Sequence, residues 1–171
     1  PVRRGVRPVE QGVIEVRQAR LDDPEDVAEA VAMIDRYAQD PMGAGQALSP
    51  DVKVRLAAML ASHPGAVVFL ASQDGRTVGV ANCFFGMSSF TGSPVLNIHD
   101  LSVVGEVRGH GVGRRLIDAV EAHARATGCS RVTLEVAAFN EAAQQVYKRC
   151  GFHGVGPDAE AVTYFCTKHL D

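Results

Sequence analysis

The dipeptide Asp74-Gly75 constrains the fold of this chain more than any other feature. It separates two apolar, β-prone runs at 66–72 and 77–85. Asp-Gly between two such runs is a strong local signal for a tight β-hairpin. The two runs are therefore predicted to pair in antiparallel fashion, which excludes an all-parallel sheet.

The rest of the chain alternates predicted strands and helices. Apolar residues at helical spacing predict helices through 27–38, 52–60, 111–126 and 140–150, and alternating patterns predict strands at 13–17, 95–104, 132–136 and 162–168. A capping residue followed by proline predicts that the first helix starts at Asp22-Asp23-Pro24 and the second at Ser49-Pro50, and Asn140 is predicted to cap the fourth. A stretch rich in Gly, Ser and Thr at 86–94 is predicted to be a loop. Strand-helix-strand units need parallel pairing, so the expected fold is α/β (α+β), with a mixed sheet of six to seven strands and about four helices.

Length and composition predict one globular domain. A chain of 171 residues with 46% hydrophobic residues fits a single core. Residues 1–12 carry three arginines and two prolines without periodicity, so they are interpreted as a flexible N-terminal arm, and 13–171 as the domain.

Charge and cysteine spacing argue against several classes of partner. A formal net charge of −3 creates no field that attracts nucleic acid or anionic lipid. No apolar run approaches the roughly 18 residues of a membrane span, and no signal core follows the N-terminal charges, so a cytoplasmic location is expected. The four cysteines form no C-x-x-C pair, so no metal site is expected. They are Cys83, Cys129, Cys150 and Cys166.

A glycine-rich turn precedes the helix at 111–126. Gly109, Gly111 and Gly113 let backbone N–H groups approach an anion closely, and the helix dipole adds partial positive charge there. Arg108 and Arg114, with Arg115, could add bonds to phosphate oxygens. The turn therefore predicts a pyrophosphate site, against the plainer interpretation that the glycines only permit a tight bend. A P-loop is excluded because Gly-Lys-Ser/Thr is missing, and a Rossmann turn would follow the first strand.

The segment Arg108-Gly109-His110-Gly111-Val112-Gly113 resembles the coenzyme A signature of the GCN5-related N-acetyltransferases. Downstream, Leu134-Glu135-Val136, Asn140, Tyr147 and Gly151-Phe152 are similar to the family's next segment. The resemblance implies a V-shaped split in the sheet that holds acetyl-CoA, a β-bulge near Leu101, and the prospect of a homodimer. The residues that it implies for cofactor binding are Leu101, Ser102, Val103, Arg108, Gly109, His110, Gly111, Val112, Gly113, Arg114 and Asn140.

Acetyl transfer to an amine needs a base, a stabilised oxyanion and an acid for the thiolate. By resemblance, Tyr147, seven residues after Asn140, is the expected acid, although it could instead only fill the core. His99, nine residues before Arg108, is the expected base, because histidine titrates near neutrality. A strand histidine that only bonds a neighbour is the alternative. Asp100 and Glu135 are further candidates for the base or for binding a cationic substrate.

The acceptor is the least specified part of this hypothesis. The segments 84–92 and 96–101 are similar to those of diamine and polyamine acetyltransferases, which have Glu-Asp where this chain has His99-Asp100. Some arylalkylamine-type members are similar in having a base histidine at this spacing. The expected function is thus an acetyl-CoA-dependent N-acetyltransferase acting on a primary amine of a small molecule or peptide. The alternative is a coenzyme A-binding regulatory module without turnover.

Overall fold

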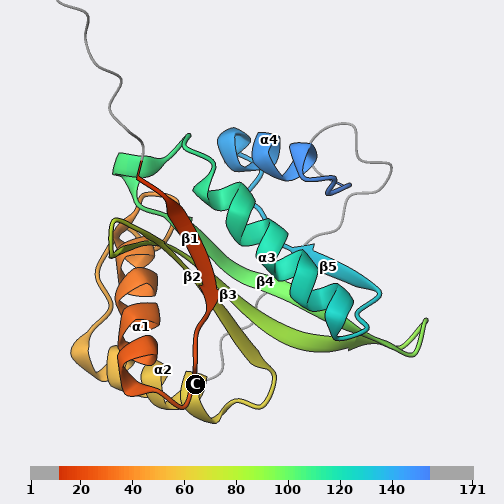
Figure 1. Cartoon of the computed structure of the whole chain (residues 1–171), viewed down its shortest axis with the longest axis horizontal. Coiled ribbons are helices and arrows are strands. Elements are labelled where there is room, and N and C mark those ends of the chain that lie inside the picture. Colours follow the sequence, from red (N-terminus) through yellow and green to blue (C-terminus); the bar gives the residue numbers. More distant parts are fainter. Residues whose placement is uncertain (1–11, 155–171) are drawn as a thin grey trace, which may run out of the picture.

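The structure is a computed structural model that describes residues 12–154. Within this range it has five strands and four α-helices (Figure 1). In chain order the elements are β1 (Ile14–Gln18), α1 (Pro24–Gln39), α2 (Pro50–Ser62), β2 (Ala66–Gln73), β3 (Arg76–Ser88), β4 (Ser93–Val103), the 3-10 turn η1 (Gly105–Val107), α3 (Val112–Ala126), β5 (Arg131–Leu134) and α4 (Glu141–Arg149).

The five strands form one mixed sheet in the order β1-β2-β3-β4-β5. The first four strands pair in antiparallel fashion, and β5 pairs with β4 in parallel. The hairpin predicted from Asp74-Gly75 is confirmed. Both turn residues have positive φ, 51° for Asp74 and 74° for Gly75, as a two-residue turn that follows the twist of the sheet requires. The parallel pair confirms the predicted mixed sheet.

The two N-terminal helices begin where the sequence predicts helix starts. Asp23 caps α1 with its side chain and is followed by Pro24 in the first turn. Ser49 caps α2 in the same way and is followed by Pro50. In both cases the cap satisfies an N–H group that has no partner inside the helix, and proline loses nothing because its missing N–H would have none.

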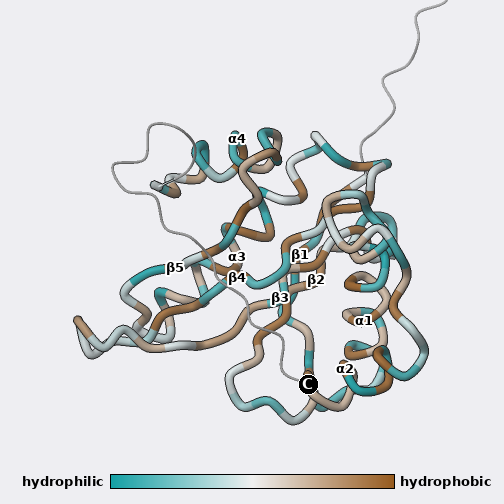
Figure 2. The backbone as a smooth tube through the Cα atoms, turned by 180° about the vertical axis from the view of Figure 1, so that it is seen from behind, coloured by the Kyte–Doolittle hydropathy of each residue, from teal (hydrophilic) through white to brown (hydrophobic). Residues whose placement is uncertain are grey.

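The sheet has a hydrophobic core on each face. Alternate residues of β2 enter opposite cores, as the period of a strand requires. Figure 2 shows that the hydrophobic stretches concentrate in the central strands and on one side of α1. The core under α3 contains Val67, Phe69, Leu96, Ile98, Leu116, Ile117 and Val120. The core under α1 and α2 contains Val31, Ile34, Leu60, Val68, Leu70 and Val80.

The loop predicted at 86–94 is wrong at both ends. Strand β3 continues to Ser88 and β4 begins at Ser93, with Ser88 directly opposite Ser93. Cross-strand pairing extends the hairpin beyond the core despite the turn-prone composition, and Phe90 at its tip is fully exposed. A ladder of backbone hydrogen bonds here outweighs the local preferences of Gly, Ser and Thr.

Two predictions from the sequence lie outside the described residues. These are the arm at 1–12, of which only Gly12 is described, and the strand at 162–168. The predicted count of six to seven strands therefore compares with five in the described range. No helix between residues 12 and 154 is both long and apolar enough to cross a membrane.

Candidate active site

Strands β4 and β5 pair only at one end, which opens the sheet beside β4. The pairing runs from Val95 opposite Arg131 to Ile98 opposite Leu134. Strand β4 then continues through 99–103 paired only with β3 in the described part of the chain. Strand β5 ends at Leu134, before the predicted limit of 136, because pairing stops where the two strands part. This is the split that the family resemblance implies.

Backbone groups of β4 face this opening. The N–H of Val104 donates to the carbonyl of Val78 on β3 at 2.9 Å. Because N–H and C=O of alternate residues point to opposite sides of a strand, Ser102 also faces β3, while Leu101 and Val103 face the opening. Of the three β4 residues predicted to bind the cofactor through their backbone, two therefore present these groups to the split. Ser102 is buried instead.

The glycine turn presents unpaired N–H groups next to the same opening. Gly109 and Gly111 have φ of 83° and 84°, and Gly111 is the N-cap of α3 without a side-chain cap. A Cβ at either glycine would meet nothing within 4 Å, so the backbone conformation, not crowding, requires glycine. The first helical bond is donated by the N–H of Arg115 to Gly111. The preceding N–H groups are left for an anion.

The nearby arginines are held by other groups. Arg108 donates through Nε to the carbonyl of Val103 at 2.9 Å and pairs with Asp40 at 2.5 Å. Its hydrogen bond is the main reason why the pKa of Asp40 is lowered. Arg114 pairs with Asp118 at 2.8 Å, which also raises the pKa of Arg114. The backbone N–H groups are thus the ready anion donors of this turn, and a phosphate would have to compete for Arg108.

Arg115 points toward β1, where it donates to the carbonyl of Ile14 at 3.3 Å. His110 follows Gly109 in the turn and is exposed, with its N–H bonded to the carbonyl of Val107 at 3.3 Å. Val112, by contrast, is 1% exposed and anchors the first turn of α3 in the core. Its side chain therefore packs in the core, while its backbone N–H is one of those at the start of α3 that have no partner inside the helix.

The β-bulge lies at His99, two residues before the position implied by the resemblance. The register passes from Asn82 opposite Asp100 to Cys83 opposite Ile98, so His99 has no partner on β3. A bulge kinks the strand and changes which way the following side chains point. His99 is also the first residue of β4 beyond its last pair with β5. The bulge therefore lies at the vertex of the split.

The polar candidates near this vertex lie on the side of the sheet that α1 and α2 cover. The exposed His99 ring packs edge-on against Phe84 of β3, with 5.7 Å between ring centroids. Asp100 accepts a hydrogen bond from the side-chain amide of Asn82 at 2.9 Å. Glu135, just after β5, accepts from Asn97 at 3.4 Å. The three predicted base or substrate residues thus surround the vertex.

Tyr147 and Asn140 come from α4. Asn140 caps the helix by accepting the N–H of Ala143 at 3.2 Å, as predicted. Tyr147 is 8% exposed, packs against Phe152, and makes no hydrogen bond to any described residue. Burial raises its pKa to about 12, with a smaller contribution from Tyr37. The ring therefore belongs to the core while the phenol holds its proton firmly.

Sequence reasoning missed Tyr37 and Asp40 at the end of α1. Burial raises the pKa of Tyr37, and the negative charges of Asp100 and Asp40 raise it further. Tyr37 of α1 is thus near enough to Asp100 and Tyr147 for the charge of Asp100 to raise the pKa of Tyr37, and for ionised Tyr37 to raise the pKa of Tyr147. The sequence carries no signal for this role, because Tyr37 follows Ile34 at helical spacing and is typical of a residue that completes an apolar face.

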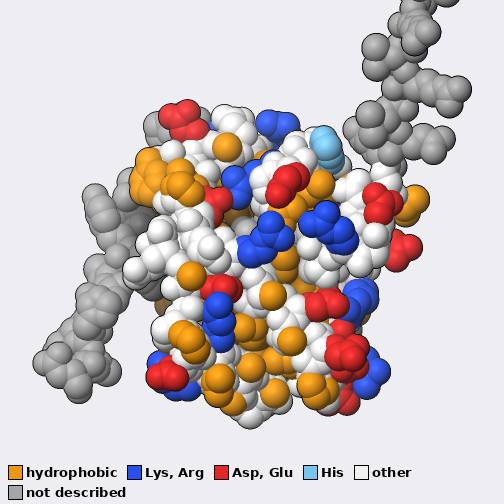
Figure 3. Space-filling model, turned by 90° about the vertical axis from the view of Figure 1, so that its left-hand side faces the viewer, with side chains coloured by type: hydrophobic (Ala, Val, Ile, Leu, Met, Phe, Trp, Pro, Cys, Tyr) orange, Lys and Arg blue, Asp and Glu red, His pale blue; other side chains and the backbone are white. Residues whose placement is uncertain are grey.

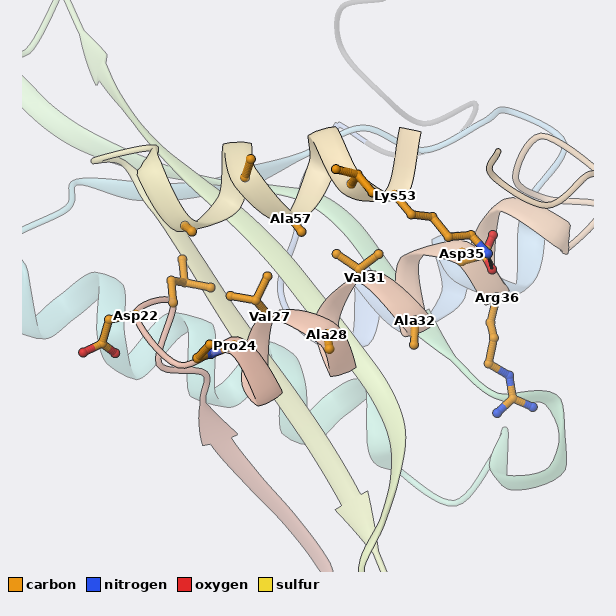
Figure 4. A pocket seen from close by; sticks show the side chains of 14 residues that line it. Asp22, Pro24, Val27, Ala28, Val31, Ala32, Asp35, Arg36, Lys53 and Ala57 are labelled. Carbon is orange, nitrogen blue, oxygen red and sulfur yellow. Dashed lines mark ion pairs between the residues drawn. The ribbon is translucent and has the colours of Figure 1, made fainter. Parts of the chain in front are cut away.

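A groove of about 840 Å³ lies elsewhere, between α1 and α2. Figure 4 shows Val27, Val31 and Ala57 around it, with Asp35 and Lys53 paired at one end, 2.6 Å apart. Figure 3 shows apolar side chains gathered on this side of the molecule among charged ones. None of the residues that line the groove belongs to the glycine turn or to β4, so we do not assign it to the reaction.

Comparison with known proteins identifies relatives over most of the chain. The model of the acetyltransferase (GNAT) family matches residues 29–152. An aminoglycoside N(6')-acetyltransferase type 1 of Stenotrophomonas maltophilia is 33% identical over 109 residues, covering 62% of this chain and 69% of that enzyme. A thialysine N-epsilon-acetyltransferase of Mus musculus is 35% identical over 80 residues, covering 47% of this chain and 46% of that enzyme.

The fold agrees with this assignment. A solved structure of an aminoglycoside N-acetyltransferase in complex with CoA has a TM-score of 0.70 at 19% identity, over 99% of this chain and 100% of that one. At this identity the likeness establishes the fold alone. Because the family model matches residues 29–152 and the fold is consistent with it, the chain is an acetyltransferase that belongs to the GNAT family.

Proposed function

We propose that this enzyme transfers the acetyl group of acetyl-CoA to a primary amine of a small molecule that carries several positive charges. One observation carries the cofactor half of the proposal: the open edge of β4 and the free N–H groups at the start of α3 border the same split. The pyrophosphate would bind the N–H groups from Gly111 onward. The pantetheine arm would bond the outward backbone of Leu101 and the N–H of Val103 as an added strand does, while the Val103 carbonyl accepts from Arg108.

The residues at the split can then divide the chemistry between them. The neutral amine attacks the thioester carbon, the carbon–sulfur bond breaks, and the products are the amide and the free thiol. The amine loses one proton and the thiolate gains one. Tyr147 supplies the proton, because a phenol with a pKa of about 12 stays protonated at neutral pH. His99 takes the amine proton, and the outward N–H of Leu101 stabilises the oxyanion.

Two features support a cationic acceptor. Asp100 and Glu135 bring negative charge to the vertex of the split, on the side that the expected pantetheine path leaves open. The names of both curated relatives specify an amine nitrogen of a small molecule as the acetylated atom. Aminoglycosides and lysine analogues carry further amines, so an acceptor of this class would bring a second positive charge.

The proposal is tested by measuring thiol release from acetyl-CoA with a panel of acceptors. The panel holds an aminoglycoside, a lysine analogue, a polyamine, an arylalkylamine and a short peptide. Acceptors with two or more amines should give kcat/KM values at least tenfold above the arylalkylamine and the peptide. A preference for the arylalkylamine or the peptide would refute the cationic acceptor. Acetyl-CoA binding without thiol release for any member would instead support a binding module without turnover.

The absence of a metal, the cytoplasmic location and the homodimer stay predictions from the sequence.

A further inference from the structure

Asn82 is an unusual residue for its place in the sheet. It lies in the middle of β3, between Val80 and Phe84 on the side that α1 and α2 cover, and it is only 3% exposed. Its side-chain nitrogen donates to Asp100 at 2.9 Å. Its side-chain oxygen is buried and has no hydrogen-bond partner in the described part of the chain.

This arrangement argues against a role in stability. An amide with one unsatisfied buried atom destabilises the folded state, whereas an apolar side chain at the same place would lose no hydrogen bond to water. Because Asn82 does not improve stability, its hydrogen bond to Asp100 indicates a functional role for this residue. Where Asn82 is removed, the half-buried Asp100 can turn to solvent, because it lies at the edge of the split.

The bulge explains why Asp100 meets Asn82 at all. If β4 continued past Ile98 without a bulge, His99 would lie opposite Asn82, and Asp100 would lie opposite Ala81 on the other face of the sheet. With it, the Asp100 carboxylate lies on the α1 side, where its charge reaches Tyr37. The carboxylate is thereby held beside the split but away from the outward backbone of Leu101.

A carboxylate in this place suits a positive charge that does not react. If Asp100 paired with the reacting amine, it would stabilise the protonated form, which cannot attack the thioester. A second ammonium of the same acceptor has no such conflict, and its attraction to Asp100 would orient the first amine. Direction matters for this task, because a charge-assisted hydrogen bond is strong only when its geometry is good.

We propose that Asn82 is a positioning residue that aims the Asp100 carboxylate at a second, non-reacting ammonium of the acceptor. This inference rests on the proposed cationic acceptor. It adds a specificity determinant on β3, a strand that does not line the predicted cofactor path. It also explains why the amide oxygen of Asn82 is buried without a hydrogen-bond partner: the stability lost there accompanies the orientation of the Asp100 carboxylate.

The test is a double-mutant cycle with Asn82→Val and Asp100→Asn. Valine is close to asparagine in size and suits a central strand. We expect Asn82→Val to melt at the same temperature as the parent or higher. For a diamine acceptor its KM should rise about tenfold, while KM for acetyl-CoA and the kinetics with a monoamine stay unchanged. In the Asp100→Asn background, Asn82→Val should have no further effect on the diamine KM.

Two outcomes overturn the inference. One is an unchanged diamine KM in Asn82→Val. The other is a loss that adds fully to that of Asp100→Asn, which would assign Asn82 to packing. Failure of the proposed function is distinguishable, because the acceptor panel alone would then show no preference for several amines. If Asn82→Val does not fold, Asn82→Ser takes its place in the double-mutant cycle, because it removes the same hydrogen bond and keeps a polar side chain.

Discussion

Replacing Gly111 by alanine should weaken acetyl-CoA binding far more than it weakens the fold. Gly111 caps α3 with φ of 84°, and a Cβ there would meet no atom within 4 Å. The cost is therefore the left-handed backbone itself, about 1–2 kcal/mol for a residue with a side chain. For a domain of this size that corresponds to a loss of about 2–8 °C in Tm.

Binding should suffer more, because the conformation of Gly111 directs the first N–H groups of α3. If the backbone relaxes to negative φ, one or two charge-assisted bonds to the pyrophosphate are lost, together about 2–4 kcal/mol. That loss corresponds to a Kd for acetyl-CoA about 30- to 700-fold higher. Titration calorimetry measures the Kd, and thermal melting measures the stability.

Two controls make the test specific. Gly105→Ala changes a glycine that also has open space around it but is not left-handed, so its Tm and Kd should match those of the parent. Acetyl-pantetheine lacks the pyrophosphate, so its KM should be equal in Gly111→Ala and the parent. A folded Gly111→Ala that binds acetyl-CoA like the parent would refute the reasoning and move the pyrophosphate elsewhere.

Three further predictions concern single residues. Tyr147→Phe keeps the buried ring but removes the acid, so kcat should fall about 10²- to 10⁴-fold at unchanged acetyl-CoA affinity; an unchanged kcat would leave only packing. His99→Ala should lower kcat about 10²- to 10⁴-fold at unchanged acetyl-CoA affinity, because it removes the group that takes the amine proton; an unchanged kcat would remove His99 from the mechanism. Asp26→Asn should lower Tm by roughly 5–10 °C at pH 7, because Asp26 is buried and accepts two bonds of 2.7 Å from Arg17. The Arg17 hydrogen bond lowers the pKa of Asp26, so this stabilisation is present above the unfolded carboxyl pKa and the Tm difference should shrink as pH falls through the folded value; a constant difference would contradict the ion pair.

The features that the sequence predicts well are those with local causes. The positive φ of Asp74 and Gly75 follows from the turn alone, and the caps at Asp23 and Ser49 follow from short-range hydrogen bonds. The glycine turn before α3 belongs to the same class, because an unpaired helix start binds anions in any fold. These signals suffice for the mixed sheet and for the place of the cofactor turn.

The features that the sequence does not reveal depend on pairing between distant residues. The bulge at His99 is a matter of register between β3 and β4, and the sequence alone does not say that Asn82 faces Asp100. Tyr37 approaches the split only because α1 packs across the sheet. The ion pair between Arg108 and Asp40 could not be predicted from the sequence for the same reason, since the two residues are 68 positions apart.

The open edge of β4 also has a consequence for solubility. An unpaired strand edge invites pairing with another chain, and proteins commonly protect such edges with charge or with bulges. Here the Arg108 side chain donates a hydrogen bond to the outward carbonyl of Val103, and the bulge at His99 bends the strand at the other end of this edge. Arg108 and the bulge at His99 therefore disfavour edge-to-edge association of two copies of the protein when no cofactor covers β4. Variants that straighten β4 or remove Arg108 should be judged for aggregation before any loss of rate is assigned to catalysis.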